Sequence, residues 1–236
     1  MTRRAKIITI VAVCVVALGA IVVIAGPPIY RDYFAAPAAE VPTLTAEDGA
    51  LTPDSTEPLD VADLSGEWAV TDGLEAGYRV DEVLRGTDVE VTGRTSEVIG
   101  SLQVTDLTVE SAEFTVDIAS IATDQPSRDD YFRNTAMRVG EHPTATFRLT
   151  EPVTASALPE PGETVELQFT GDLTLAGVTQ SVTFTAQART DGTTAEVAGQ
   201  IPITFEDYGV TAPDLGFVRV EPTGNVEFSL VFARQG

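Results

Sequence analysis

The stretch from Val165 to Ala188 alternates apolar and polar residues with a period of two. The alternation is unbroken from Val165 to Leu175 and resumes from Val182 to Ala188, after the turn Ala176–Thr179. A period of two places every apolar side chain on one face of a β-strand, whereas an amphipathic helix needs a period near 3.6. Gly177 can adopt the positive φ that a tight hairpin requires. The pattern therefore predicts an antiparallel hairpin with one buried face.

Shorter alternating segments fill most of the chain after Gly66 and predict further strands. We expect them over residues 67–70, 77–84, 88–95, 98–104, 107–121, 145–149, 197–205, 218–220 and 226–232. Eight or more strands, with one short helix and no second core, indicate an all-β domain. A closed antiparallel β-barrel has no exposed strand edges, and a β-sandwich fits the same periodicity, so the residues alone leave both open.

Residues 114–149 place the one helix between two strands. Ser127 is expected to cap a helix that runs to Val139, because acidic residues follow it in the first turn, where the helix dipole favours them. Tyr131 and Phe132 begin its apolar stripe. Such a short helix is not stable alone, so we expect it to cover the open end of the barrel or sheet.

Three motifs in this region and a fourth beyond it resemble the YceI-like family. They are IASIATD (118–124), RDDYFR (128–133), HPTATF (142–147) and GDLTLAGVTQSV (171–182), and the resemblance extends over roughly residues 66–233. Members of the family are extracytoplasmic, lipocalin-like antiparallel β-barrels, and some bind polyisoprenoid lipids in an apolar tunnel. The resemblance thus implies a closed, lipocalin-like barrel with the short helix capping one end, and makes the β-sandwich the alternative.

Composition divides the chain into three parts. Residues 1–26 carry three basic residues followed by the apolar run Ile7–Ala25, which is about as long as a bilayer needs. Residues 27–63 hold six prolines and many acids, and are expected to form a disordered stalk. Residues 64–236 form the barrel domain.

The length of the apolar run favours a transmembrane helix over a signal segment. The basic flank predicts a cytoplasmic N-terminus and an extracytoplasmic C-terminal domain, in a single-pass protein of the cell membrane. Secretion after signal cleavage is the alternative.

The charge of the chain limits its partners. The formal net charge is -22, and after Lys6 there are 11 arginines and no lysine against 36 acidic residues. A phosphate backbone would be repelled, so we expect no nucleic-acid partner, and docking on an anionic lipid surface is equally disfavoured. The composition is typical of a soluble exported domain, and it does not indicate an oligomeric state.

The sequence offers few residues for catalysis. His142 is the only histidine, and Cys14, the only cysteine, lies in the apolar run, so no Cys–His, Ser–His–Asp or multi-histidine metal set can be assembled. The acids at 129, 130 and 141 lack the ligand spacing of an EF-hand. We therefore expect a protein that is not an enzyme and has no catalytic residues, metal or cofactor. A carboxylate-only glycoside hydrolase is the enzyme class that this argument excludes least.

The remaining feature is the apolar interior. A barrel of about eight strands is either filled by side chains or holds one small ligand. Together with the resemblance, this predicts extracytoplasmic binding or carriage of a long-chain amphiphilic lipid of the isoprenoid or quinone type. An acidic protein-interaction module with a packed core is the alternative, and a carboxylate-based hydrolase the third possibility.

The candidate ligand-binding residues are the inward apolar positions and the helix that would cover the mouth. Arg128 could contact a phosphate or another polar head, or form a structural ion pair with a neighbouring acid. The full set is Phe114, Val116, Ile118, Arg128, Tyr131, Phe132, Phe147, Phe169, Leu173, Leu175, Val182, Phe184, Phe205, Phe228 and Leu230.

Overall fold

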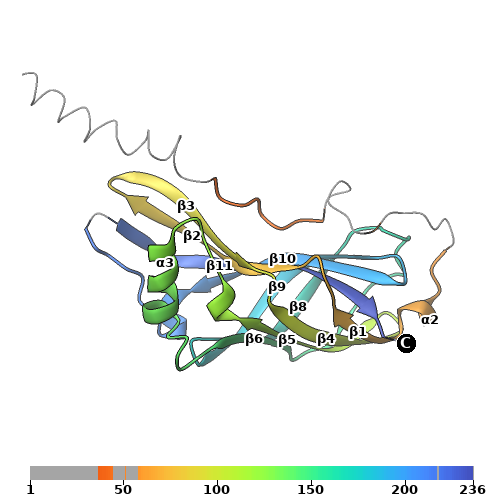
Figure 1. Cartoon of the computed structure of the whole chain (residues 1–236). Coiled ribbons are helices and arrows are strands. Elements are labelled where there is room, and N and C mark those ends of the chain that lie inside the picture. The colour runs from red at the N-terminus through yellow and green to blue at the C-terminus, as the bar shows by residue number, and fades with distance from the viewer. Residues whose placement is uncertain (1–36, 45–50, 52–57, 217, 236) are drawn as a thin grey trace, which may run out of the picture.

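The computed structural model of the chain describes residues 37–44, 51, 58–216 and 218–235 (Figure 1). Within these ranges no helix has the length and apolar character needed to cross a bilayer. The expected transmembrane segment, residues 1–26, lies outside the described residues.

Antiparallel strands make up most of the described chain. They are β1 (Gly66–Val70), β2 (Glu75–Leu84), β3 (Thr87–Thr95), β4 (Val98–Thr105), β5 (Thr108–Asp117), β6 (Thr144–Leu149), β7 (Val153–Thr154), β8 (Val165–Leu175), β9 (Val178–Thr190), β10 (Thr194–Thr204) and β11 (Val218–Arg234). The helical elements are α2 (Val61–Leu64), η1 (Ile118–Ser120), α3 (Pro126–Tyr131), the π-helical η2 (Phe132–Ala136) and η3 (Phe205–Tyr208).

The strands close into a barrel. Neighbouring strands pair in the order β1-β4-β5-β6-β8-β9-β10-β11, and β1 pairs in turn with β11, where Trp68 lies opposite Arg234 and Val70 opposite Phe232. This ring confirms the closed antiparallel barrel and excludes the β-sandwich. The expected hairpin is β8–β9, and its turn residues Ala176 and Gly177 both have positive φ, as a tight turn between twisted strands requires.

The barrel wall is not closed along its whole length. β11 pairs with β10 on one edge, but its other edge is shared between β2, near its start, and β1, near its end. β1 has only five residues, so it closes one end, while the β2–β3 hairpin forms the wall at the other. The outer edge of β3 meets the rest of the barrel through a single bridge, Arg94 to Ala122.

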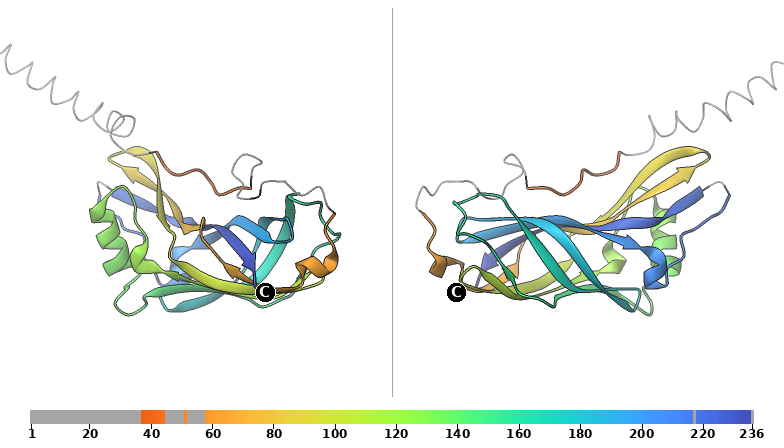
Figure 2. Two further views of the ribbon diagram at one scale, coloured as in Figure 1. Left: turned by 45° about the vertical axis from the view of Figure 1, so that its right-hand side comes forward. Right: turned by 180° about the vertical axis from the view of Figure 1, so that it is seen from behind.

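We call the end with the β2–β3 hairpin and α3 the mouth end, and the end with β1 and α2 the far end. Figure 1 shows α3 beside the hairpin and α2 at the opposite end, and both views in Figure 2 show the same separation.

The helix at the mouth differs from the expected one. It begins at Pro126 after the N-cap residue Gln125, whereas Ser127 was the expected cap. Proline suits the first helical position because its φ is already helical and its missing N–H would be unpaired there. After Tyr131 the helix widens into the π-turn η2 and ends at Ala136, short of the expected Val139. The Met137 N–H donates to the carbonyl of Phe132, which closes this last wide turn.

Part of the expected stalk is docked on the barrel. Residues 37–44, which we call the strap, lie along the outer face near β3 (Figure 1). Residues 58–64 pack at the far end, where the Trp68 Nε1–H donates to the Leu64 carbonyl at 2.9 Å and Arg234 donates to the Asp63 carbonyl at 2.8 Å. Of the residues 27–63 expected to form a stalk, the two described segments are held against the barrel by groups far along the sequence.

Candidate functional site: an apolar interior in two parts

Two adjoining cavities, both partly open, lie within the barrel and at its mouth. The mouth cavity has a volume of about 760 Å³ and is lined by β2, β3, η1, α3 and η2. The inner cavity has a volume of about 220 Å³ and extends towards the far end, where Leu64 and Trp68 line it. The larger volume falls in the range of sites that hold a drug-sized ligand, roughly 300–1,000 Å³. Five residues line both cavities and mark their junction: Ala76, Val116, Ala145, Leu175 and Val226.

A cluster of phenylalanines forms the wall of the inner cavity. The ring of Phe184 lies 5.5 Å from that of Phe147 and 5.7 Å from those of Phe169 and Phe228, measured between centroids. They come from four strands, β6, β8, β9 and β11, and all occupy inward positions of the alternating pattern. Offset and edge-on rings of this kind pack well against one another and leave an apolar surface towards the cavity.

Nearly all of the residues predicted to bind ligand lie at one of the cavities. The mouth cavity is lined by Val116, Ile118, Arg128, Tyr131, Phe132, Leu175 and Phe205. The inner cavity is lined by Phe114, Val116, Phe147, Phe169, Leu173, Leu175, Phe184, Phe228 and Leu230. Val182, which pairs with Gly171, lines neither cavity; it is only partly buried and packs against the core.

A charged cluster occupies the mouth cavity. The carboxylate of Glu82, which is 6% exposed, accepts a hydrogen bond from Arg128 Nη2 at 3.1 Å. Arg128 Nη1 donates to Asp124 at 2.7 Å. Two carboxylates thus share one guanidinium, and Arg128 forms the structural ion pair considered above with acids from β2 and from the segment before α3. The cluster carries a net negative charge, and among the described residues that line the mouth cavity Arg128 is the one cation, already paired.

A third carboxylate, that of Asp129, is also held beside the mouth. Asp129, 7% exposed, accepts hydrogen bonds from the Thr123 N–H at 2.9 Å and the Thr123 hydroxyl at 2.8 Å. Arg133 lies 3.8 Å from it. Asp129 therefore fastens the start of α3 to the preceding segment, which fixes the helix over the mouth.

Two tyrosines bring uncharged hydroxyl groups to the mouth cavity. The Tyr78 ring stacks on Phe132 with centroids 4.8 Å apart, and its burial raises the pKa of the hydroxyl to about 12. Burial likewise raises the pKa of Tyr208 to about 12, and the Tyr208 hydroxyl has no hydrogen-bond partner among the described residues. Both phenols are therefore neutral donors at physiological pH.

Sequence reasoning missed Tyr78 and Glu82 as site residues. The signal was present, because Tyr78, Val80 and Glu82 alternate along one strand and a carboxylate on an otherwise apolar face has to find a partner. It also missed the alanines of the junction as ligand positions, and the strap residues Pro37, Ala38 and Ala39, which line the mouth cavity.

His, Cys, Asp and Glu are the residue types that a metal site would use. Among the described residues, no group of three or more His, Cys, Asp or Glu side chains is placed to hold a metal ion. His142 packs against Gly177 in the β8–β9 turn and lines neither cavity.

Fold and site together define a class: a closed antiparallel β-barrel whose apolar interior is accessible at one end and carries a few polar groups there. The chain belongs to the YceI-like domain family, whose model matches residues 71–232.

Solved structures agree with this fold. A polyisoprenoid-binding domain from Saccharophagus degradans is 17% identical, with a TM-score of 0.58 over 72% of this chain and 99% of that chain. BcnA from Burkholderia cenocepacia is 21% identical, with a TM-score of 0.52 over 65% of this chain and 95% of that chain. At these identities the likeness establishes the fold alone. No curated protein sequence matches the chain.

Proposed function

We propose that the protein binds one long-chain isoprenoid lipid, with the tail in the two adjoining cavities and the head at the mouth, on the extracytoplasmic side of the membrane. The observation that carries the proposal is the apolar interior that continues from the mouth past the junction into the phenylalanine-lined cavity. The relative from Saccharophagus degradans, described as polyisoprenoid-binding, supports the same ligand class. The basic N-terminal flank supports the extracytoplasmic location.

The energetics favour a long tail. An empty apolar cavity costs about 24 cal/mol per Å³, so the inner cavity of about 220 Å³ corresponds to about 5 kcal/mol when nothing fills it. A lipid tail in the inner cavity recovers this energy, and each buried CH₂ contributes about 0.8 kcal/mol before the entropy of ordering the tail is subtracted.

The charged cluster favours an uncharged head. Arg128 is already matched by Glu82 and Asp124, so a phosphate would bring further negative charge to a site with no free cation. A quinone carbonyl or a hydroxyl group would instead accept or donate hydrogen bonds with the neutral phenol of Tyr78. We therefore propose a prenylated quinone or a prenyl alcohol in place of a prenyl phosphate.

A substitution in the tail site tests the proposal. Phe184→Arg places a charge, at an 8% exposed position, among the four phenylalanines, and uptake of a fluorescent prenyl quinone should be abolished. Ile99→Arg is the matched control, because Ile99 is 72% exposed on the outer wall and lines neither cavity. Equal uptake by Phe184→Arg and Ile99→Arg would contradict lipid binding in the barrel.

A series of ligands that differ only in the head group tests the proposed preference for an uncharged head. With tails of one length, the wild-type protein should bind the quinone and the alcohol at least about tenfold more tightly than the phosphate, which corresponds to about 1.4 kcal/mol. Glu82→Gln leaves Arg128 less compensated and should narrow that ratio. A phosphate that binds as tightly as the quinone would refute the choice of head, while leaving tail binding in place.

The two alternatives fit the structure less well. A module with a packed core would not leave a cavity of about 220 Å³ beside the phenylalanines. A carboxylate-based hydrolase needs carboxylates free to act on a substrate, whereas Glu82, Asp124 and Asp129 are held by Arg128 and Thr123.

A further inference from the structure

The strap is attached to the barrel at both of its ends. The Ala39 N–H donates to the Thr92 hydroxyl at 3.0 Å, and Arg79 Nη2 donates to the Ala39 carbonyl at 2.5 Å. Five residues further on, the Leu44 N–H donates to Gln187 Oε1 at 2.7 Å. Because these partners belong to β2, β3 and β9, the strap crosses the outer face of several strands and is held there by side chains.

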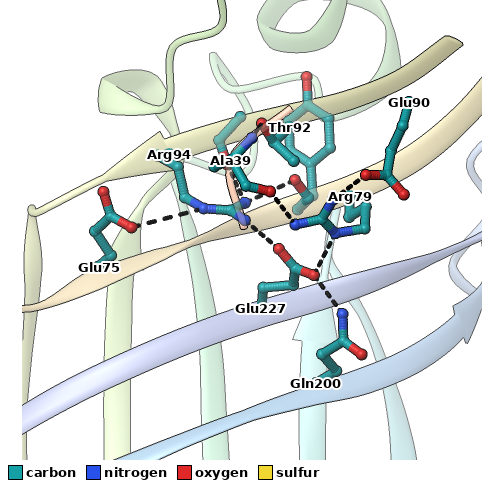
Figure 3. A network of polar contacts seen from close by, with 10 residues as sticks. Ala39, Glu75, Arg79, Glu90, Thr92, Arg94, Gln200 and Glu227 are labelled. Carbon is teal, nitrogen blue, oxygen red and sulfur yellow. Dashed lines mark hydrogen bonds and ion pairs between the residues drawn. The ribbon is translucent and has the colours of Figure 1, made fainter. Parts of the chain in front are cut away.

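A buried ionic network lies next to the strap (Figure 3). Glu227 is fully buried and accepts hydrogen bonds from Arg79 Nε, at 2.6 Å, from Arg94 and from Gln200. Burial alone would lower the pKa of Arg79, but its hydrogen bond and ion pair with Glu227 outweigh this and raise the pKa. Arg79 is thus a fixed cation, held by Glu227 on one side and presented to the Ala39 carbonyl on the other.

The direction of the strap is set by these contacts. Its first residues, Pro37 to Ala39, line the mouth cavity, and from there it runs towards the far end, where residues 58–64 dock. Figures 1 and 2 show it starting on the side of α3 and running towards α2. The segment nearer the N-terminus is therefore attached first, through Ala39, to the β2–β3 hairpin on the mouth side of the barrel.

The chain before the strap is short. From residue 26, the end of the expected transmembrane segment, to residue 37 there are eleven residue steps, which span at most about 40 Å when fully extended. Treated as a flexible coil, they span about 18 Å on average. The barrel is longer than this average span, since the 17 residues of β11, tilted as barrel strands are, extend over about 40 Å along the axis.

We infer that the docked strap turns the mouth of the barrel towards the bilayer, so that a lipid passes directly between the membrane and the mouth cavity. The partner of the mouth is the lipid surface itself. This inference rests on the proposed function and on the expected membrane anchor. Leu215, which lines the mouth cavity and is 58% exposed, gives the rim an apolar contact for that surface.

The acidic surface of the protein explains why a tether is needed to orient it on a membrane. Peripheral proteins are usually drawn to membranes by basic residues, and this chain has 11 arginines against 36 acids after Lys6. Electrostatics cannot orient such a surface towards an anionic bilayer. A short tether fixed beside the mouth does so by geometry.

The test uses the full-length chain in phosphatidylcholine vesicles. A Cys14→Ser background removes the only cysteine, and a fluorophore is placed at Leu215→Cys near the mouth or at Thr105→Cys at the far end, close to Asp106, whose N–H donates to Ser65. Energy transfer to acceptor-labelled lipid head groups should be at least about twofold stronger from position 215 than from position 105, given the tether length.

Release of the strap gives the matched comparison. Ala39→Pro with Thr92→Val removes the donor and the acceptor at the mouth-side end of the strap, and Leu44→Pro with Gln187→Ala removes those at its other end; the released variant carries all four changes. The difference between the two labels should then shrink or reverse, because the next docked segment, residues 58–64, lies at the far end.

Two results would overturn the inference: equal transfer from both labels in the wild-type background, or a difference that release of the strap leaves unchanged. Loss of the protein from washed vesicles would overturn it as well. Uptake of prenyl quinone by the same protein in solution reports the proposed function separately, so it can succeed where the orientation fails.

Discussion

Blocking the junction between the two cavities should shorten the lipid tail that the barrel accepts. Ala145 lines both cavities from β6 and is 7% exposed, so Ala145→Phe places a ring at the passage between them. The mouth cavity stays available, whereas the inner cavity is cut off. The variant should therefore bind short-tailed quinones as the wild-type protein does and lose affinity only for long ones.

The magnitude follows from the size of the inner cavity. At roughly 30 Å³ per methylene-sized group, as for water, its volume of about 220 Å³ holds about seven carbon atoms, or one to two isoprene units. At about 0.8 kcal/mol per buried CH₂, these carbons contribute about 5 to 6 kcal/mol before entropy is subtracted. The loss of affinity for long tails should thus lie between about tenfold and about 10⁴-fold.

The assay is a titration with quinones of increasing tail length. In the wild-type protein affinity should rise with each isoprene unit until both cavities are filled, and in Ala145→Phe it should level off one to two units earlier. Ala136→Phe is the control, because Ala136 lines the mouth cavity alone and should weaken all tails without moving the plateau. If both variants level off at the wild-type length, the tail does not pass the junction and the reasoning fails.

Three further predictions concern stability and titration. Glu227→Gln should lower the free energy of unfolding in urea by about 3–5 kcal/mol, whereas Glu221→Gln, at an exposed ion pair, should change it by less than about 1 kcal/mol. Burial raises the pKa values of Tyr78 and Tyr208 from 10.0 to about 12. The stability that depends on their neutral hydroxyl groups is therefore fully present below pH 10.0 and is lost as the pH rises to about 12. An ultraviolet titration of Tyr78→Phe should lack one late-ionising tyrosine, and a curve identical to that of the wild type would contradict this. Burial would raise the pKa of Asp191, but backbone and side-chain hydrogen bonds from neighbouring threonines outweigh it and lower the pKa below 3.8. Asp191→Asn should therefore have a lower melting temperature than the wild type at neutral pH. In acid, below the pKa of Asp191, the two melting temperatures should become equal.

The strands and the inward faces could be predicted from sequence because a period of two encodes them locally. The pattern from Val165 to Ala188 predicted both strands of the hairpin, and its turn at Ala176 and Gly177 has the positive φ values expected there. The alternation also predicted that Phe147, Phe169, Phe184 and Phe228 face the barrel interior, since residues two apart on a strand share a face. Val182 shows the limit of the parity rule, because it packs against the core from an inward position of β9 and still lines neither cavity.

The features that depend on pairing between distant segments could not be predicted. Glu82 and Arg128 are 46 positions apart, and the Leu44 N–H bonds a side chain 143 positions away. Periodicity tells which face of a strand is buried but not which strand lies beside it. The strap was expected to be disordered because its composition cannot form a core of its own, yet a surface supplied by three strands holds it in place.

The identity of the lipid that copurifies with the protein from its host tests the central claim most directly. The full-length chain would be purified from its host, and the bound lipids extracted, weighed against protein and identified by mass spectrometry, with Phe184→Arg purified in parallel. We expect about one prenyl quinone or prenyl alcohol per wild-type chain and none above background on the variant. Wild-type protein that carries no isoprenoid, or no more than Phe184→Arg carries, would contradict the account.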